Sequence, residues 1–372
     1  MTLSKPRVAI AHDYITQRGG AERVVLAMAR AFPDAPIYTT LYQPETTFGE
    51  FAGLDIRPSI LNRVAPLRRN HRGALPFLAP AVDTIHIDAD VVISSSSGWA
   101  HGVHTTGSKL VYCYSPARWL YQSDVYLGDR PSLPKAAALG ILSPWLRQWD
   151  RRAASTATRY LAISTAVKDR IRTAYGLEST IVPAPHSVAT DLALEAVPGV
   201  GDDFYLCISR LLPYKNVDKI IEAMRDTPDR RLVVVGAGPE EGALRSTLPS
   251  NVTMLKNLSD GQIRWLYLRS RAVVAASYED YGLTPIEAAV FGKPSVVLRW
   301  GGFLDTVIEN RTGVFFDEPI ARRISEALDR FEARSWDSTV IVESASRFTE
   351  EVFAGALRAQ VDELSTLAGS LR

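Results

Sequence analysis

Residues Ala272–Pro294 have the sequence AVVAASYEDYGLTPIEAAVFGKP, in which an apolar run leads into a loop and then into a helix. The run Ala272–Ala276 has the composition of a buried strand, and a Gly-Lys-Pro tripeptide ends the helix. Thr284, Pro285 and Glu287 fit a capped helix start, which is the structural interpretation of this loop. A strand followed directly by a helix is the unit of a parallel α/β sheet.

The same alternation of short apolar runs and amphipathic segments continues along the whole chain. Apolar strands separated by helices are typical of parallel sheets covered on both faces. The strands expected in the first half are Val8–Ala11, Ile37–Thr40, Val91–Ser94, Leu110–Cys113 and Tyr160–Ile163. Those expected in the second half are Phe204–Ile208, Leu232–Val235, Val252–Leu255, Ala272–Ala276, Ser295–Leu298 and Val314–Phe316. The sequence therefore predicts an α/β protein with two doubly wound, Rossmann-like domains.

Loop-forming residues in the region Pro183–Asp203 predict the domain boundary. We expect residues 1–185 to form the first domain and residues 186–345 the second. The last segment, 346–372, has apolar residues at helical spacing and follows the second sheet, so we expect a helix that crosses back to the first domain. Paired domains of this kind face a cleft with the carboxyl ends of their strands, where ligands bind.

Composition excludes several classes of protein. The 372 residues carry a formal net charge of +1, which does not fit the strongly basic domains that bind nucleic acid. Cys113 and Cys207 lie in apolar runs and are expected to be buried thiols of a reducing compartment. The first strand follows the N-terminus too closely for a signal peptide, and no apolar run approaches the roughly 20 residues that span a bilayer. We therefore expect a cytoplasmic protein.

Two cations follow the strand Phe204–Ile208. Arg210 and Lys215 lie in the loop after this strand, and Asn216 is placed to cap the next helix. A cation directly before a helix N-terminus is unfavourable, and an anion bound between Arg210 and Lys215 would resolve the conflict. The alternative is a pair of solvated surface charges.

The loop of the opening segment is the second half of this candidate anion site. Gly282 allows a close approach of the backbone to a ligand, and the amides around Leu283 and Thr284 are suited to an anion. Glu279 lies on the same loop without an evident structural role. Gly236 begins a glycine turn that resembles a dinucleotide fingerprint but lacks its third glycine, so we expect a tight turn close to the cleft.

In the first half, Asp13, Gly19 and Gly20 follow the first strand and open a helix. Two glycines at a helix N-terminus let amides approach an anionic group, although a plain turn fits equally well. His101 is expected to be a polar loop residue that lines the cleft. The histidines lack metal-ligand spacing, and Asp88 with its neighbouring aspartate is expected to be a solvated turn, so no metal and no cofactor is expected.

Taken together, these segments resemble the family-4 retaining glycosyltransferases, which have the GT-B fold. The segments that carry the resemblance are Gly19-Gly20-Ala-Glu22, Ser209-Arg210 with Lys215, Val235-Gly236-Ala-Gly238, the Glu279/Glu287 pair and Gly301-Gly302. The resemblance implies that Arg210 and Lys215 hold the donor diphosphate, that Glu279 contacts donor-sugar hydroxyls, and that Glu287 binds the nucleotide ribose. It also implies that amides at Gly282–Thr284 contact the phosphates or sugar and that Gly20 lines the cleft.

The first half is similar to a narrower branch that includes mannosyltransferases of bacterial surface polysaccharides. Those relatives commonly have histidine where this chain has Tyr114, a residue expected near the donor sugar. The resemblance implies a GDP- or UDP-linked hexose donor, with mannose favoured, and a glycan or lipid-diphosphate-linked acceptor. A nucleotide-sugar epimerase of GT-B fold and a noncatalytic nucleotide-sugar binder remain as alternatives.

One stretch of the first half mixes cations with apolar residues. It contains Arg63, Arg68, Arg69 and Arg72. Such a mixture is expected either of a solvated helix face or of a surface that docks on anionic lipid or on a lipid-linked acceptor.

Overall fold

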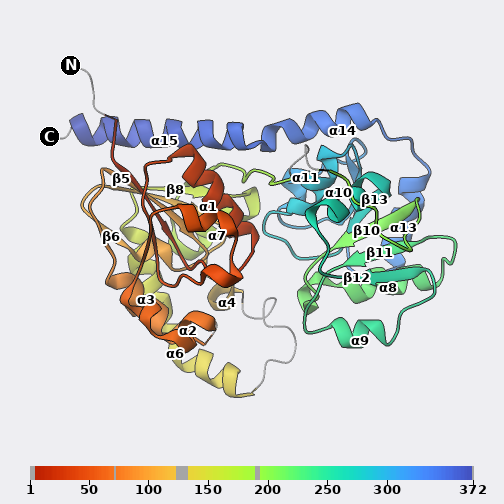
Figure 1. Ribbon diagram of the computed structural model, residues 1–372, viewed down its shortest axis with the longest axis horizontal. Coiled ribbons are helices and arrows are strands. Elements are labelled where there is room, and N and C mark those ends of the chain that lie inside the picture. The colour runs from red at the N-terminus through yellow and green to blue at the C-terminus, as the bar shows by residue number, and fades with distance from the viewer. Residues whose placement is uncertain (1–4, 71–72, 123–132, 189–192, 371–372) are drawn as a thin grey trace. The chain divides into compact units, whose positions relative to one another are not determined.

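The computed structural model describes residues 5–70, 73–122, 133–188 and 193–370. The chain divides into two compact units, and each is described by itself (Figure 1). Unit 1 comprises residues 1–185 together with 350–372, and unit 2 comprises residues 186–349. The sequence placed the corresponding boundaries after residues 185 and 345.

Unit 1 is built on a parallel sheet of seven strands within the described residues. In sheet order these are β3 (Ile56–Pro58), β2 (Ile37–Thr39), β1 (Val8–His12), β5 (Val91–Ser96), β7 (Ser108–Cys113), β8 (Arg159–Ala162) and β9 (Ser179–Ile181). A separate small pair joins β4 (His86–Ile87) to β6 (His104–Thr105). The strand order reverses between β1 and β5, which makes this the switch point where doubly wound sheets bind ligands.

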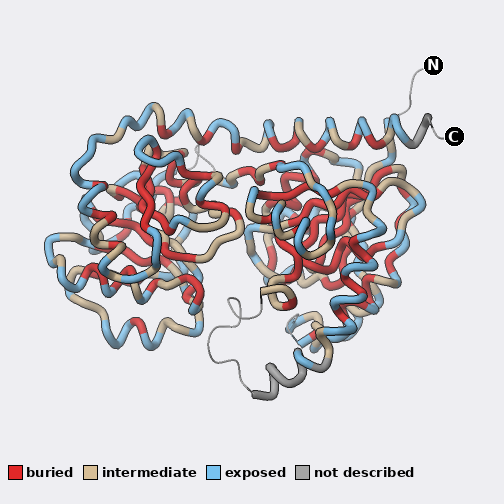
Figure 2. The backbone as a smooth tube through the Cα atoms, turned by 180° about the vertical axis from the view of Figure 1, so that it is seen from behind, coloured by how far each residue is buried: buried red, intermediate tan, exposed pale blue. Residues whose placement is uncertain are grey.

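The helices of unit 1 connect and cover these strands. They are α1 (Gly20–Ala31), α2 (Ala65–Arg69), α3 (Leu75–Asp83), α4 (Arg118–Tyr121), α6 (Leu133–Ser155), α7 (Thr165–Tyr175) and α15 (Glu350–Ser370). Short 3-10 turns add η1 (Pro44–Thr46), η2 (Gly49–Gly53), η3 (Ile60–Arg63) and η4 (Ala100–Gly102). Figure 2 shows the buried residues, in red, gathered in the interior of each unit.

The last helix, α15, returns to unit 1 and packs against α1, β5 and β7. Its buried face consists of Phe353, Leu357, Val361 and Leu364, which recur at helical spacing. The guanidinium of Arg358 donates to a backbone carbonyl of α1 at 3.2 Å. Val352 and Leu367 belong to the same run of apolar residues, but both are about half exposed and are not part of this face.

Unit 2 contains a second parallel sheet, of six strands among the described residues. In sheet order these are β12 (Val252–Leu255), β11 (Leu232–Val235), β10 (Phe204–Ile208), β13 (Ser270–Ala275), β14 (Ser295–Leu298) and β15 (Gly313–Phe316). Its helices are α8 (Val217–Arg225), α9 (Glu241–Arg245), α10 (Asp260–Arg269), α11 (Leu283–Val290), α12 (Phe303–Thr306), α13 (Ala321–Glu332) and α14 (Ser338–Ala345). The 3-10 turns are η5 (Pro213–Lys215) and η6 (Ser346–Phe348). The order reverses between β10 and β13.

The inner strands of both sheets are buried on both faces, as their continuous apolar runs predicted, whereas the edge strands β3 and β9 are largely exposed. In unit 2 one core cluster includes Tyr205 and Val234, and a second cluster, on the opposite face of the sheet, includes Leu206 and Val233. Cys113 and Cys207 are free, buried thiols. Among the described residues, no helix is both long enough and apolar enough to cross a membrane.

Unit 1 also buries a lysine. The side chain of Lys109, on β7, donates from Nζ to the backbone carbonyl of His101 at 2.9 Å and to Oγ1 of Thr156 at 2.6 Å. The residue is 4% exposed, and burial lowers its pKa to about 8. Desolvation penalises the ammonium form, and the two neutral oxygens compensate for it only in part.

This lysine makes the stability of unit 1 depend on pH. Above pH 8 the folded state loses the Lys109 proton while the unfolded chain keeps it up to its ordinary pKa near 10.4, so stability rises with pH in this window. We expect the free energy of unfolding of the wild type, relative to Lys109→Met, to rise by about 2 kcal/mol from pH 8 to 9.5. Urea unfolding followed by tryptophan fluorescence measures the difference, and parallel pH profiles would contradict the assignment.

Candidate functional site

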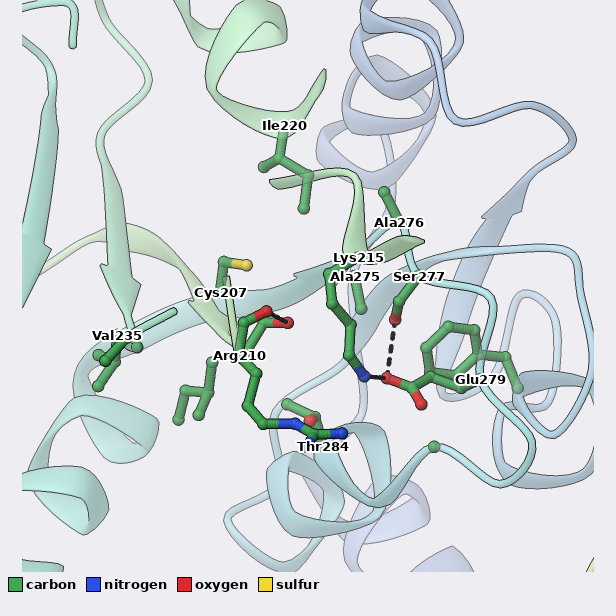
Figure 3. Close-up of a pocket in the computed structure, with 16 residues that line it drawn as sticks. Cys207, Arg210, Lys215, Ile220, Val235, Ala275, Ala276, Ser277, Glu279 and Thr284 are labelled. Carbon is green, nitrogen blue, oxygen red and sulfur yellow. Dashed lines mark hydrogen bonds and ion pairs between the residues drawn. The ribbon is translucent and has the colours of Figure 1, made fainter. Parts of the chain in front are cut away.

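The candidate site is a pocket of about 370 Å³ in unit 2, at the switch point between β10 and β13 (Figure 3). The loops that leave the carboxyl ends of β10, β11 and β13 form its walls, and the N-terminus of α11 contributes backbone. Its lining residues are Cys207, Ile208, Ser209, Arg210, Lys215, Ile220, Val235, Gly236, Ala237, Ala275, Ala276, Ser277, Glu279, Gly282, Thr284 and Phe303. This is the edge where the topology of a parallel sheet predicts a ligand.

Lys215 and Glu279 form an ion pair inside this pocket. Nζ of Lys215 contacts Oε1 of Glu279, and the hydroxyl of Ser277 donates to the same oxygen at 3.1 Å (Figure 3). The side chain of Lys215 is 9% exposed and that of Glu279 is 25% exposed. Burying an ammonium to this extent is costly, and a paired carboxylate offsets part of that cost. Glu279 supplies this counter-charge, so the carboxylate has a structural role that the sequence did not indicate.

Arg210 extends into the same space beside Lys215 (Figure 3). One of its terminal nitrogens donates to the hydroxyl of Tyr214 at 3.2 Å, and the rest of the side chain is exposed. The ring of Tyr214 also lies under the Lys215 ammonium, 4.7 Å from the ring centre to Nζ. With Glu279 as the one carboxylate among the lining residues, the pocket has an excess of one positive charge. It is therefore suited to an anion.

Asn216 fixes the direction of this loop. It occupies the N-cap of α8, as predicted, but its backbone is left-handed (φ 51°) and its side chain makes no capping hydrogen bond. Its amide instead donates to the carbonyl of Ala276 at 2.8 Å. The hydrogen bond joins the loop after β10 to the loop after β13, which brings Lys215 and Glu279 together.

The start of α11 differs from the predicted capping box. The N-cap is Gly282, with a φ of 86°, and Thr284 lies inside the helix, so the prediction of Thr284 as the cap is wrong. No side chain caps this end, so Leu283 and Thr284 belong to a helix start whose first amides point out of the helix. A Cβ at Gly282 would lie 2.6 Å from the ring of Phe303, so this close packing also requires glycine.

Glu287 makes a hydrogen bond to the neighbouring helix. Its Oε2 accepts a hydrogen bond of 2.7 Å from the hydroxyl of Tyr267, on α10. The lining of the pocket does not include Glu287 or Leu283, whereas Arg210, Lys215, Glu279, Gly282, Thr284 and Gly236 all contribute to it. The structure thus brings together most of the residues predicted for this half.

Glycines allow the loops around the pocket to approach one another. A Cβ at Gly236 would lie 1.8 Å from the carbonyl oxygen of Ser209, so the turn after β11 packs directly on the loop that carries Arg210. A Cβ at Gly302 would lie 2.2 Å from Cα of Tyr281, and the amide of Gly302 donates to the carbonyl of Glu279 at 3.0 Å. The Gly301-Gly302 turn therefore supports the Glu279 loop from behind.

In unit 1, Asp13 lies at the switch point between β1 and β5. Its carboxylate, 2% exposed, accepts hydrogen bonds from the amides of Ser97 at 2.6 Å, Trp99 at 3.1 Å and Ala100 at 2.6 Å. These bonds fasten the loop after β1 to the loop after β5. The predicted cleft residue Asp13 is thus engaged by backbone amides of its own unit.

His101 is also buried, with 2% exposed. Its Nδ1 lies 3.0 Å from the hydroxyl of Ser96, and its Nε2 lies 3.1 Å from Oδ1 of Asp150. Asp150 in turn accepts a hydrogen bond of 2.8 Å from Tyr121. His101 therefore belongs to a buried polar network of unit 1.

Tyr114 lies near the start of α1. Its hydroxyl is 2.9 Å from that of Ser95 and donates to the carbonyl of Ala21 at 3.3 Å. Gly19 is the N-cap of α1, and Gly20, the first helical residue, is exposed. Burial dominates around Tyr114 and raises the pKa of its phenol, so the group stays neutral and acts as a hydrogen-bond donor.

The arginines of the predicted docking stretch are not equivalent. Arg63 and Arg69 are exposed. Nε of Arg68 donates to the side-chain oxygen of Gln43 at 2.7 Å, so this cation connects helix α2 to the segment before η1. Arg72 lies outside the described residues. Two described arginines therefore present their charge to solvent in this stretch.

No group of three or more histidine, cysteine, aspartate or glutamate side chains in the described part of the chain is arranged to hold a metal ion. Asp88 and Asp90 form ion pairs of 3.1 and 3.3 Å with Arg7 at the surface. These aspartates follow β4 and precede β5, so they belong to a turn.

Two hydroxyl groups beside the predicted carboxylates were missed. Ser277 is adjacent in sequence to the Glu279 loop, so its position was a usable signal. Tyr267 is 20 residues from Glu287, and no spacing rule connects an interior residue of one helix to the next helix.

Each half of the chain matches a family model. Residues 18–192 match "Glycosyltransferase Family 4", and residues 196–351 match "Glycosyl transferases group 1". A glycosyltransferase of Bacillus subtilis, the uncharacterized YqgM, is 27% identical over 55% of this chain and 63% of its own length. The GDP-mannose-dependent alpha-(1-6)-phosphatidylinositol monomannoside mannosyltransferase of Mycolicibacterium smegmatis is 26% identical over 45% of this chain and 51% of its own length. The chain thus matches about half to two thirds of the length of these curated relatives.

Among solved structures, Anabaena HepE in complex with UDP-glucose is similar to this chain with a TM-score of 0.67 at 17% identity. The match covers 96% of this chain and all of that one. At this identity the likeness concerns the fold, which is GT-B: two parallel-sheet α/β domains.

The close packing of Gly302 against the Glu279 loop can be tested by substitution. Gly302→Ala places a methyl group against the Tyr281 backbone and should destabilise unit 2 by about 1–3 kcal/mol through overpacking. Gly242→Ala is the control, because its Cβ meets no atom within 4 Å and alanine favours helix α9. Thermal unfolding compares the two variants. Equal stability of both would show that the Gly301-Gly302 turn has room to adjust.

Proposed function

Because the chain belongs to the family-4 glycosyltransferases of GT-B fold, we propose that it is a retaining transferase that moves a hexose from a nucleotide diphosphate sugar. The observation that carries this proposal is the pocket of unit 2, where Arg210 and Lys215 converge beside the N-terminus of α11. A planar guanidinium binds two phosphate oxygens at once, while an ammonium acts as a point charge. Uncapped amides of α11 add a third source of positive potential.

The proposed chemistry depends on stabilising the leaving group. The hydroxyl oxygen of the acceptor attacks the anomeric carbon on the face of the departing phosphate, and the bond from that carbon to the phosphate oxygen breaks. The acceptor proton passes to the departing diphosphate. Negative charge grows on the diphosphate during this step, and preorganised cations lower the barrier by binding it more strongly in the transition state. Arg210 and Lys215 provide this charge, so the proposal requires neither a metal nor a cofactor.

The Lys215–Glu279 ion pair fits this proposal. A bound diphosphate would take over the role of counter-charge to Lys215, which releases Glu279 to accept hydrogen bonds from hydroxyls of the donor sugar. Glu287 is proposed to bind the ribose. We favour mannose as the sugar and GDP ahead of UDP as the nucleotide, in line with the mannosyltransferase named above. The acceptor is proposed to be a glycan or a lipid-diphosphate-linked glycan bound by unit 1, in polysaccharide or glycoconjugate synthesis.

Two other functions are compatible with a nucleotide-sugar pocket. An epimerase would convert the donor without any acceptor, and a noncatalytic protein would bind the donor without consuming it. The free thiols Cys113 and Cys207 favour a reducing compartment for either function, and we propose the cytoplasm.

A nucleotide panel tests the donor site. We expect one of GDP, UDP and ADP to raise the stability of the wild type by about 2.7 kcal/mol at a hundredfold excess over its dissociation constant. Arg210→Ala should lose most of this gain, because the guanidinium proposed to bind two phosphate oxygens is removed. Arg322→Ala is the matched control, since Arg322 is 72% exposed on α13 and away from the pocket. Thermal shift measures the gain, and a wild type that no nucleotide stabilises would refute the proposal.

The docking stretch of unit 1 supports a second proposal, peripheral contact with an anionic membrane. Besides Arg63 and Arg69, it exposes Val64 (44%) and, on helix α3, Phe77 (51%), and Ile60 (71%) lies exposed just before it. Cations interleaved with exposed apolar side chains match the chemistry of an anionic lipid surface, where each basic residue contributes about 1 kcal/mol.

Cosedimentation with liposomes tests this contact. Replacing Arg63 and Arg69 by serine should weaken binding to phosphatidylserine vesicles at low salt by about 30-fold, from the loss of about 2 kcal/mol. Replacing Arg322 and Arg323 by serine changes the charge equally on unit 2 and should leave binding unchanged. A wild type that binds neutral and anionic vesicles alike would exclude the membrane contact.

A further inference from the structure

We propose that Tyr267 is a positioning residue of the donor site, which acts by fixing the carboxylate of Glu287 for the nucleotide ribose. The inference rests on the proposed function, because it presumes that Glu287 binds the ribose. Tyr267 itself would touch neither the nucleotide nor the sugar.

The geometry around Tyr267 holds its hydroxyl in one place. The residue is 0% exposed, and its ring stacks on Phe291 with 5.4 Å between ring centres and 14° between planes. Ser270 donates to its backbone carbonyl at 2.9 Å, where α10 passes into β13. Because the ring is confined in this way, the position of the hydroxyl is fixed. The hydroxyl donates to Oε2 of Glu287 at 2.7 Å.

In the Tyr267–Glu287 hydrogen bond the phenol is the donor, and losing the bond costs binding energy. Burial raises the pKa of Tyr267 well above its usual value, and the negative charge of Glu287 raises it further, so the phenol remains protonated and donates. A hydrogen bond to an ionised acceptor is stronger than a neutral one. It also removes rotational freedom from a glutamate side chain, which would otherwise have to be ordered when a ligand binds.

A carboxylate is effective toward a ribose only in a defined orientation, because it accepts hydrogen bonds from vicinal hydroxyls along particular directions. Glu287 lies on α11, whose N-terminus lines the pocket, so helix and carboxylate are fixed to the same rigid element. Tyr267 comes from the neighbouring helix α10. The bond therefore connects two elements of unit 2 at the position where the ribose is proposed to bind.

The test compares ribose with dideoxyribose nucleotides by isothermal titration. The probes are GDP and 2′,3′-dideoxy-GDP, with the UDP pair in parallel. Tyr267→Phe keeps the ring and its stacking and removes only the hydroxyl. We expect this substitution to raise the dissociation constant of the ribose nucleotide about tenfold and that of the dideoxy nucleotide by less than twofold. In a Glu287→Ala background the same change should have no further effect on either nucleotide.

Tyr205→Phe is the matched control. Tyr205 is also 0% exposed and donates to a glutamate, Oε1 of Glu332, at 2.6 Å, but Glu332 is on α13, which contributes no residue to the lining of the pocket. Its loss should leave the preference for ribose unchanged, and the melting temperature of each ligand-free variant reports any loss of folding.

Each remaining outcome overturns the proposal. If Tyr267→Phe weakens the binding of both nucleotides equally, the role of Tyr267 is structural. If it weakens the binding of neither, the Tyr267–Glu287 hydrogen bond does not position Glu287. A wild type that binds ribose and dideoxyribose nucleotides alike removes the role of Glu287 but leaves the donor site in place. A wild type that binds no nucleotide refutes the proposed function and this inference with it.

Discussion

The pocket of unit 2 depends on a compensated charge, the buried ammonium of Lys215. Nine tenths of this side chain is withdrawn from water, and Glu279 compensates its charge from a loop 64 residues away. To hold the pair, the chain joins the two loops through Asn216 and supports the Glu279 loop with the Gly301-Gly302 turn. The pair is thus the point at which the packing of unit 2 and the chemistry of an anion site meet.

Unit 1 also buries a charged group, in this case a carboxylate. The carboxylate of Asp13 lies at the switch point of its sheet and is satisfied by three backbone amides rather than by a cation. Such a carboxylate is engaged by its own unit, whereas under the proposed function Lys215 exchanges Glu279 for a phosphate. Unlike the surroundings of Asp13, the lining of the unit 2 pocket has an excess of one positive charge.

Sequence patterns predicted the scaffold well where burial alone determines structure. Continuous apolar runs such as Leu232–Val235 form strands with the expected bounds, because both faces of the strand are covered. The edge strand Ile56–Pro58 was missed, since it is short, largely exposed and contains proline. The cap of α11 was assigned to Thr284, although Gly282 takes that position through its left-handed backbone and its contact with Phe303. That contact is tertiary, and a local capping rule does not include it.

The same distinction applies to the site. Arg210, Lys215 and Glu279 were identifiable because each follows a strand whose carboxyl end must lie at the ligand edge of the sheet. Ser277 and Tyr267 donate hydrogen bonds to Glu279 and Glu287. Their sequence positions do not indicate this role, which depends on contacts formed in the folded chain. A charged residue can be predicted to face a ligand from topology, but its orientation is set by neutral neighbours. In this protein those neighbours come from the end of β13 and from α10, so the fold of unit 2 as a whole determines how its carboxylates meet a ligand.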